Sequence, residues 1–549
     1  MRSTERAPLV LMATLAAAAL GLGIGRTELW PPDETRVAEI SREMLVEGTW
    51  SVPRLNGRPF LEEPPLFYWL QAAAYRVAGG PSAVAARIPA ALSAVAVLPA
   101  AIILGRLAGA SVGLTVLALC TAPEFWWMAR SGTPDTALAA TTSLALVLFL
   151  LAWRSGRASL LAAATICAAV AFWLKSLLGV GLATLTVATF VGWKGRGRLR
   201  WRDLLIAALA LALAAGVWLV VLWRAEGPGA VTFFVVTNHL GRLLGAPNQG
   251  HVRSVFYYLP EMAVGLFPWS LALPASFAAA WKERDEPARC FALLWAATML
   301  LALSASTSKN AHYLLPAYPA LAVLVAAWWP GEEGRIAALT QRLFAFGVVV
   351  VCPVLALVVL SLDVQAIMRG GPIRAGTFGN PTPVWAWLAT ALFTMLGIAF
   401  LAARRSLRAD RAATMAGASA LLLHVIIATI VLPRFDVFCS ARIWGEDMAK
   451  DAARGYRVVA FGFSNREALS PFMFYAGHRI EEIASERELT ELLKEGHVYA
   501  LVRYDAYARL TGLLRELPST PGEVGRLRFV VIHDHARVST DVRQIARTM

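Results

Sequence analysis

Two adjacent carboxylates, Asp33 and Glu34, lie shortly after an apolar run near the start of the chain. The run, residues 7–24, carries no charge and is long enough to cross a membrane as a helix. A polar pair in this position indicates a chemical site built at the membrane surface. The alternative is structural, because Asp33 follows two prolines and could cap a helix that begins near Thr35. Local sequence leaves both interpretations open.

Further charged side chains stand beside long apolar runs, where an ion is costly unless it is paired or used. Asp135 opens one run, either as a helix cap or beside a helix start whose backbone N–H groups favour an anion. Lys175 separates two runs, and it either extends to the membrane surface or binds a phosphate. Basic residues in two other polar segments are either ordinary surface groups or, together, further cations of the same site: His239, Arg242, Lys309 and His312.

The composition shows what kind of scaffold must position these residues. Of the 549 residues, 57% are hydrophobic and 16% are charged, and the mean hydropathy is +0.56. These values indicate an all-α polytopic membrane protein rather than a soluble domain. The net charge of +14 is explained by cytoplasmic arginines that set the topology, so no nucleic-acid partner is expected.

The hydropathy pattern predicts about 13 membrane-spanning helices. They are expected at residues 7–24, 84–105, 109–123, 135–152, 158–174, 177–193, 204–223, 254–280, 289–305, 313–329, 343–362, 384–403 and 412–433. With the N-terminus in the cytoplasm, every second connection is short and basic, as the positive-inside rule requires. The odd number of helices then places the C-terminal segment on the outer face.

This topology brings the candidate residues to one side of the membrane. The carboxylates Asp33, Glu34 and Asp135 fall on the outer face, and so do Lys175 and the other basic residues named above. A ring of cations facing separated carboxylates suits a phosphate-bearing lipid substrate better than a pore. A pore needs charge along a path through the helices.

Two regions outside the spans carry their own patterns. The first outer connection, residues 25–83, contains two amphipathic or aromatic segments, 34–47 and 65–75, that predict interfacial helices beside the membrane. Residues 436–549 have the composition of a soluble domain, and they predict a small periplasmic α/β domain that follows a transmembrane domain at 1–435. Its expected strands are 458–463, 498–502 and 529–532, and its expected helices are 442–454, 486–495 and 505–516.

Several motifs resemble those of membrane glycosyltransferases of the GT-C class. The segment Pro32-Asp33-Glu34-Thr35-Arg36 and its continuation to Met44 resembles the first-loop signature of the lipid A aminoarabinose transferases and their dolichyl-phosphate-mannose-dependent mannosyltransferase-like relatives. Further matches follow in the same order along the chain, at 62–69, at Asp135, at Lys175, at 238–242 and at 308–316. The resemblance covers roughly residues 25–330 well and the remainder only by layout.

The resemblance implies sugar transfer from a polyprenyl-phosphate donor to a lipid A-like lipid or a glycan acceptor at the periplasmic face of the bacterial inner membrane. Asp33 is then the leading catalytic carboxylate, assisted by Glu34 and Asp135. Three roles are open for Asp33: general base, substrate positioner, or ligand, with Asp135, of a divalent cation. Residues implied to bind substrate phosphates are Lys175, His239, Arg242, Lys309 and Arg58, and those implied to position donor or acceptor are Tyr313, His312 and Glu63.

One residue departs from the family pattern. Where the family has Lys in a Glu-Lys-Pro motif, this chain has Glu63, whose charge would repel a donor phosphate. Either another cation, Arg58 or Lys175, takes over that contact, or the donor or acceptor differs from the aminoarabinose case. The alternative functions are a transporter or flippase for lipid-linked sugars, a non-catalytic assembly subunit, and a protein O-glycosyltransferase of the same class.

Overall fold

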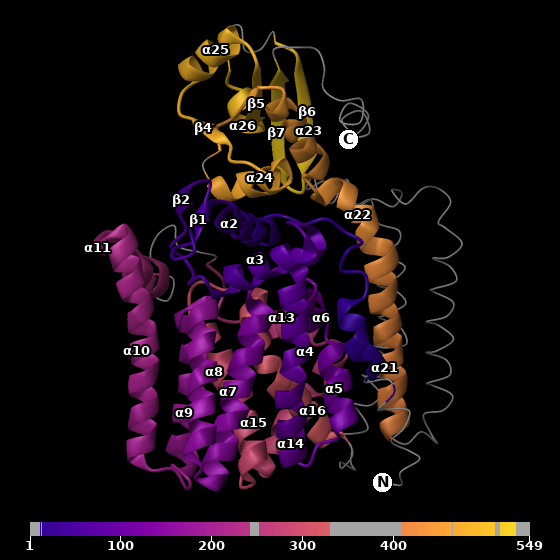
Figure 1. Cartoon of the computed structure of the whole chain (residues 1–549). Helices are drawn as coiled ribbons and strands as arrows, with labels where there is room; N and C mark the ends of the chain where they lie inside the picture. The colour runs from indigo at the N-terminus through magenta and orange to yellow at the C-terminus, as the bar shows by residue number, and fades with distance from the viewer. Residues whose placement is uncertain are drawn as a thin grey trace.

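The computed structural model describes residues 11, 14–241, 252–329, 409–463, 465–510 and 517–533. Three layers follow one another along the molecule: a helical bundle, two helices that lie across one end of it, and a sheet with covering helices beyond them (Figure 1). The predicted spans 343–362 and 384–403 lie outside the described residues, so the predicted number of 13 spans stays a prediction.

The bundle contains the helices that could cross a membrane. Within the described residues eight helices are long and apolar enough, or ten spans if two bent pairs count as one each. The eight are α4 (Ala83–Leu107), α7 (Asp135–Ser155), α8 (Ala158–Lys175), α9 (Leu177–Lys194), α10 (Trp201–Glu226), α15 (Pro287–Ala305), η4 (Ala311–Ala317) joined to α16 (Tyr318–Trp328), and α21 (Ala409–Ile426) joined through η6 (Ile427–Val431) to α22 (Leu432–Cys439). The candidate span in the last of these runs from Ala416 to Asp436. The bounds of the eight spans agree with the predicted ones to within a few residues.

Two spans differ from the prediction because the chain bends inside them. Helix α5 (Val112–Cys120) continues after a 69° bend as α6 (Pro123–Ala129), a segment that the sequence assigned to an outer loop. The chain also bends inside the expected span at 254–280, since α13 (Tyr258–Gly265) turns by 117° before η3 (Trp269–Ala272) and α14 (Leu273–Lys282). Proline stands at both bends and lacks the N–H group that a continuous helix requires.

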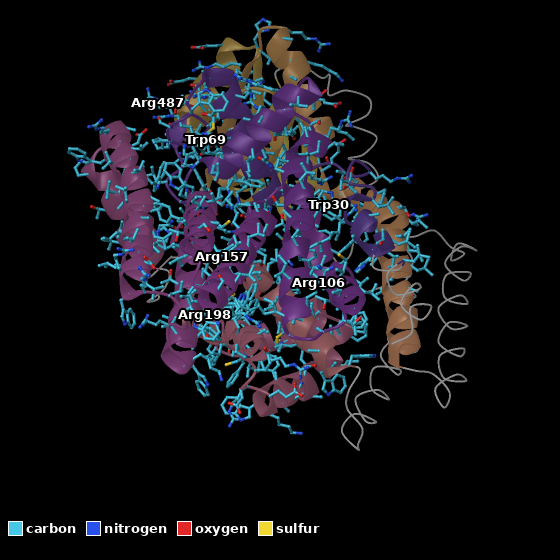
Figure 2. The ribbon with its side chains drawn as sticks, turned by 60° about the horizontal axis from the view of Figure 1, so that its bottom comes forward. Trp30, Trp69, Arg106, Arg157, Arg198 and Arg487 are labelled. Carbon is cyan, nitrogen blue, oxygen red and sulfur yellow. The ribbon has the colours of Figure 1, made fainter. Side chains whose placement is uncertain are left out.

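The two ends of the bundle differ in their side chains. Arg106, Arg157 and Arg198 lie at the end far from Trp30 and the C-terminal sheet (Figure 2). Arg106 lies in the last turn of α4, Arg157 directly precedes α8 and Arg198 follows α9, so the chain is basic at this end of the bundle. The opposite end carries the longer first connection of the chain. The sequence predicted this separation of basic connections from long ones.

Helices α2 (Asp33–Glu47) and α3 (Leu66–Ala78) separate the bundle from the sheet, with a hairpin of β1 (Arg54–Leu55) and β2 (Arg58–Pro59) between them (Figure 1). The sequence pattern predicted an amphipathic helix with its charges opposite its apolar face, and in the fold several of these charges are covered as well. Glu39, Arg42 and Glu43 are buried. The C-terminal part of the chain packs over them, and Arg42 compensates Glu39 through two hydrogen bonds of 2.7 Å.

The C-terminal part carries a five-stranded mixed sheet in the order β4-β3-β5-β7-β6. The strands are β3 (Arg457–Phe461), β4 (Glu481–Ile483), β5 (Val498–Arg503), β6 (Ser519–Val524) and β7 (Leu527–His533). Strands β3, β4 and β5 are parallel, and β6 and β7 run antiparallel to their neighbours. The accompanying helices are α23 (Arg442–Ala453), η7 (Arg466–Leu469), α24 (Ser470–Ala476), α25 (Glu486–Glu495) and α26 (Tyr504–Tyr507).

Alternate residues of the central strand β5 face two separate apolar clusters. Tyr499 and Leu501 belong to a cluster that also contains residues of α2, α3, α23 and α24, whereas Ala500 and Val502 pack with leucines of α25. Burial on both faces explains why β5 is apolar throughout rather than alternating. Strands β4 and β6 were not predicted, because β4 has only three residues and β6 contains Pro521 and Gly522.

Candidate active site

A cavity of about 260 Å³ opens where the start of α2, the corner between α6 and α7, the end of α8 and the start of η4 meet. It therefore lies at the end of the bundle that α2 and α3 cover. Seven predicted site residues line it: Asp33, Glu34, Glu63, Asp135, Lys175, His312 and Tyr313. The folding of the chain thus brings together side chains that are up to 280 positions apart, counted from Asp33 to Tyr313.

Asp33 and Glu34 are the first two residues of α2, and neither caps that helix. The N-cap residue is Pro32, which has no side chain able to accept a hydrogen bond from the helix. The Asp33 carboxylate instead accepts a hydrogen bond of 2.7 Å from Arg36, one turn further along. Its side chain remains 46% exposed, so Asp33 is accessible from the cavity while it is held by an arginine.

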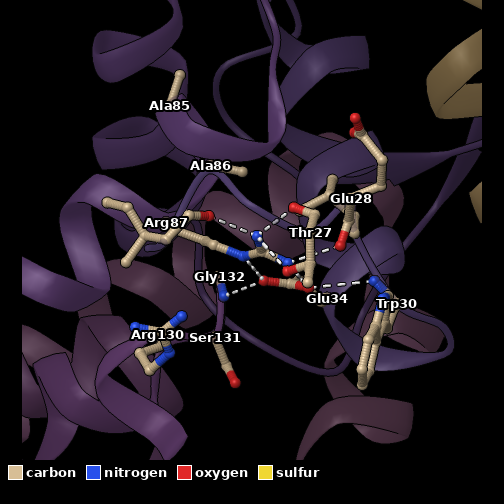
Figure 3. A network of polar contacts seen from close by, with 12 residues as sticks. Thr27, Glu28, Trp30, Glu34, Ala85, Ala86, Arg87, Arg130, Ser131 and Gly132 are labelled. Atoms are coloured by element: carbon tan, nitrogen blue, oxygen red, sulfur yellow. Dashed lines mark hydrogen bonds and ion pairs between the residues drawn. The ribbon is translucent and has the colours of Figure 1, made fainter. Parts of the chain in front are cut away.

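Glu34 is buried and fully engaged (Figure 3). Its two oxygens accept hydrogen bonds of 2.6 and 2.8 Å from the Arg87 guanidinium, one of 2.8 Å from the Gly132 amide and one of 3.1 Å from the Trp30 amide. Arg87 also donates to the backbone carbonyls of Ile24, Thr27 and Glu28. This network ties the end of the first apolar segment, the start of α2, α4 and the α6–α7 corner to one another.

Asp135 begins α7 and faces Lys175 and His312, with Tyr313 beside the lysine. Lys175 Nζ lies 2.5 Å from Asp135 Oδ1, and His312 Nε2 lies 3.9 Å from the same oxygen. The Lys175 ammonium also lies 5.4 Å from the centre of the Tyr313 ring, a cation–π distance. Asp135 makes no side-chain capping bond within α7. Its carboxylate instead offsets the charge of a lysine that is itself buried.

The position of Lys175 depends on a break between two helices. Helix α8 ends at Lys175 and α9 begins at Leu177, with Ser176 between them at φ 55° and ψ −141°. Such a conformation is rare for a residue other than glycine and needs support from its surroundings. The Ser176 hydroxyl lies 2.5 Å from His239 Nε2, so His239 holds the break in place. His239 contacts Ser176, next to Lys175, and does not itself line the cavity.

Glu63 also lines the cavity, next to Glu62. The Tyr68 hydroxyl donates a hydrogen bond of 3.4 Å to the Glu63 carboxylate. Burial raises the pKa of Glu63 above its usual value, and Lys175 and Arg36 lower it only in part. The carboxyl group therefore holds its proton to higher pH than an exposed glutamate does, which weakens the repulsion expected between this residue and a phosphate.

Two other predicted residues, both within the described ranges, do not line the cavity. Lys309 is buried, and its ammonium donates to the backbone carbonyls of Ser306 and Arg253. Arg58 lies exposed on β2 and does not replace the lysine that the family has at position 63. Arg242 lies outside the described residues.

The cavity is also lined by three arginines that the sequence analysis did not assign to a site: Arg36, Arg87 and Arg130. Arg87 could have been identified from the sequence, because it is a charged residue within an apolar helix and such residues are paired or functional. Arg130 is buried, donates to the carbonyls of Leu22 and Gly23, and stacks on the Trp126 ring at 4.8 Å. Within the described ranges, no carboxylate forms an ion pair with Arg130.

One role left open for Asp33 was to bind a divalent cation together with Asp135, and the cavity does not fit such an ion. Among the residues that the structure describes, no three His, Cys, Asp or Glu side chains gather closely enough to hold a metal. Asp33 already pairs with Arg36, and Asp135 pairs with Lys175. Each candidate ligand thus faces a fixed positive charge that would oppose a second cation at the same oxygen.

Comparisons with known proteins match this architecture. A family model described as dolichyl-phosphate-mannose-protein mannosyltransferase matches residues 62–223. An undecaprenyl phosphate-alpha-4-amino-4-deoxy-L-arabinose arabinosyl transferase 2 of Pseudomonas fluorescens is 31% identical over 398 residues, which is 68% of this chain and 68% of the relative. The enzyme of the same name from Sodalis glossinidius is 30% identical over 411 residues, or 68% of this chain and 72% of the relative.

Solved structures of similar fold include ArnT from Cupriavidus metallidurans. The crystal structure of ArnT from Cupriavidus metallidurans bound to undecaprenyl phosphate superposes with a TM-score of 0.73 at 22% identity, over 96% of this chain and 98% of that one. The apo structure of the same protein gives a TM-score of 0.72 over 97% and 99% of the two chains. At this identity the likeness shows a shared fold.

The apolar helices and the bacterial relatives indicate a multi-pass protein of the bacterial inner membrane. The identity to the arabinosyl transferases extends over more than two thirds of the chain, and the fold of a solved ArnT covers nearly all of it. The chain belongs to the aminoarabinose transferase family of GT-C membrane glycosyltransferases, whose curated members are named undecaprenyl phosphate-alpha-4-amino-4-deoxy-L-arabinose arabinosyl transferases.

Proposed function

We propose that this protein transfers a sugar from a polyprenyl-phosphate donor to a lipid A-like acceptor at the periplasmic face of the inner membrane, as in lipopolysaccharide modification. The observation that carries the proposal is a cavity at one end of the apolar bundle, which is lined by an accessible carboxylate, Asp33, and by Lys175 and His312. The relatives' name supports a polyprenyl-phosphate donor, because it specifies undecaprenyl phosphate-linked aminoarabinose.

Lys175 and His312 are the groups that bind the donor phosphate in this proposal. Lys175 ends an apolar helix and is held at the cavity by Asp135, so its ammonium is fixed before a substrate arrives. Charge develops on the leaving polyprenyl phosphate during transfer, and preorganised cations stabilise that charge more strongly than water does. Tyr313 completes this side of the cavity and positions the donor sugar.

The reaction breaks one bond and forms another at the anomeric carbon. An acceptor oxygen attacks this carbon, the bond from the carbon to the phosphate oxygen breaks, and the electron pair leaves with the polyprenyl phosphate. If the acceptor is a hydroxyl group, its proton passes to Asp33 as general base. If the acceptor is a phosphate, it is already anionic, and Asp33 orients it. Glu34, which is engaged by Arg87, supports the start of α2 in this proposal.

Arg130 is the group that we assign to an anionic acceptor. It lines the cavity, is buried, and donates only to backbone carbonyls and to an aromatic ring in the described contacts. A buried guanidinium without a carboxylate partner favours an anion at its side. Trp30 and Trp127, whose rings lie 6.0 Å apart, give the same part of the cavity an apolar wall suited to a lipid.

The orientation and the domain boundary belong to the same proposal. The basic connections at one end of the bundle support a cytoplasmic N-terminus and a periplasmic cavity. We place a transmembrane domain of 13 spans at 1–435 and a periplasmic α/β domain at 436–549. The order of the strands in the sheet and its position beyond α2 support this division.

In vitro transfer tests the proposal. Purified protein is supplied with defined polyprenyl-phosphate sugars and with lipid A, lipid A without its phosphates, or a Ser/Thr-rich peptide. We expect transfer to lipid A, and Asp33→Asn is expected to lower turnover by about a hundredfold or more, within the range of general base catalysis. Equal turnover in the two proteins would overturn the role of Asp33, and transfer to the peptide alone would favour a protein O-glycosyltransferase.

A reconstituted-vesicle assay separates transfer from transport. Vesicles with a fluorescent polyprenyl-phosphate sugar on one leaflet are incubated with the protein in the absence of acceptor. We expect no acceleration of movement between leaflets. Movement without transfer would instead support the flippase alternative.

A further inference from the structure

The C-terminal part of the chain holds the helix that carries Asp33. Helix α24 packs against α2, and a buried contact joins the hydroxyls of Thr35 and Ser470 at 3.0 Å. The Arg42 guanidinium also donates a hydrogen bond of 2.8 Å to the carbonyl of Gly477. These contacts lie along one face of α2, whose first residues line the cavity. The sheet and its helices are therefore in direct contact with the candidate active site.

Arg36 connects the two parts through a single guanidinium group. One terminal nitrogen lies 2.7 Å from an oxygen of Asp33, and the other lies 2.8 Å from an oxygen of Glu467. The Arg36 side chain is 18% exposed and that of Glu467 is 24% exposed, so water screens this contact only in part. Arg36 Nε is buried and has no hydrogen-bond partner among the described residues.

The backbone of Glu467 is fixed on both sides. Its amide donates a hydrogen bond of 2.9 Å to the Asn465 side chain, and its carbonyl accepts one of 2.7 Å from the Ser470 hydroxyl. Ser470 is the residue that contacts Thr35 on α2. The Glu467 carboxylate is thus presented to Arg36 from a turn that is itself attached to the helix carrying Asp33.

We propose that Glu467, from the C-terminal part of the chain, is a positioning residue: it binds one terminal nitrogen of Arg36 and so keeps that nitrogen from Asp33. An arginine can pair with a carboxylate through two parallel hydrogen bonds, which is the stronger arrangement. In this structure Glu467 takes one terminal nitrogen, so Arg36 holds Asp33 through one oxygen and the second oxygen stays available at the cavity. The proposal rests on the proposed function of Asp33.

Substitution of Glu467 removes this competition. In Glu467→Gln the charge that attracts Arg36 is lost, and Arg36 is expected to close on both oxygens of Asp33. We expect kcat to fall between about tenfold and a hundredfold, the range for displacement of a reacting group by about 1 Å. KM for donor and acceptor should be nearly unchanged, because no phosphate contact is altered. Glu467→Asp, which keeps the charge, should recover part of the activity.

The matched control is Glu481→Gln. Glu481 also pairs with an arginine, Arg457, at 2.6 Å in the same part of the chain, but this pair lies between β3 and β4 on the sheet. If Glu467 only stabilises the C-terminal domain, the two variants should lose stability and activity to a similar extent. A fall in kcat no larger than that of Glu481→Gln would overturn the proposal, and so would an effect confined to KM.

A second measurement does not depend on sugar transfer. A water-soluble carbodiimide labels accessible carboxyl groups, and mass spectrometry gives the labelling rate of Asp33. We expect this rate to fall at least about threefold in Glu467→Gln and to be unchanged in Glu481→Gln, since an oxygen bonded to arginine is less reactive. An unchanged rate in Glu467→Gln would refute the proposal. An absence of transfer by the wild-type protein would instead refute the proposed function.

Discussion

The Glu34–Arg87 pair gives the sharpest prediction about stability. In Glu34→Ala the buried Arg87 guanidinium loses its only hydrogen-bonded carboxylate in the described structure, and the amides of Trp30 and Gly132 lose their acceptor (Figure 3). Removal of one partner of a buried ion pair costs about 3–5 kcal/mol. Each unsatisfied amide adds about 1–3 kcal/mol if water cannot reach it. Arg87 keeps three backbone acceptors, so we expect a total of about 4 kcal/mol.

The pair can be tested by a double-mutant cycle. Unfolding by sodium dodecyl sulfate in mixed micelles is followed through the tryptophan fluorescence of wild type, Glu34→Gln, Arg87→Met and the double variant. Glu34→Gln leaves the buried Arg87 without a carboxylate partner, and Arg87→Met leaves the buried Glu34 without a cationic partner. The double variant has neither uncompensated charge. We expect the double variant to lose about 2 kcal/mol less than the sum of the singles, within the range for directly bonded residues.

An exposed ion pair provides the control for this cycle. Glu491 and Arg487 lie one turn apart on α25, with side chains 60% and 89% exposed. Glu491→Ala should change the free energy of unfolding by less than about 0.5 kcal/mol, as for other exposed pairs. The reasoning fails if Glu34→Ala is as mild as this control, or if the losses of Glu34→Gln and Arg87→Met simply add.

Two further predictions concern the cavity. Burial raises the pKa of Glu63, so this carboxyl becomes anionic only as the pH rises through that raised value. The anionic carboxylate repels the donor phosphate, so KM for the donor should increase with pH in the wild type. In Glu63→Gln this KM should vary less with pH. Parallel pH profiles of KM in the two proteins would contradict this. Arg130→Met should raise KM for phosphorylated lipid A by about tenfold to a hundredfold, because a hydrogen bond to a charged group contributes about 1.5–3 kcal/mol. KM for dephosphorylated lipid A and KM for the donor should change little. A change in donor KM alone would place Arg130 on the donor side.

Much of the fold and part of the site could be predicted from sequence. The bounds of α7, α8 and α9 follow from runs of apolar residues, because hydropathy is a local property of the chain. Lys175 and Asp135 were identifiable because each is a charge at the end of such a run. The bend at Pro268 was not predicted, since a proline near the end of an apolar stretch is compatible with either a kink or a new helix.

The sequence by itself determined the class of the protein, and it predicted the outer-face position of the polar residues and Asp33 as the candidate reacting group. Only the tertiary structure decided which charges compensate one another. Arg87 lies 53 positions from Glu34, and Glu467 lies 431 positions from Arg36. The energy of an ion depends on what surrounds it in space, and no local pattern records a partner that far along the chain. For the same reason the amphipathic pattern of α2 does not show that Glu39, Arg42 and Glu43, opposite its apolar face, are buried in the folded protein.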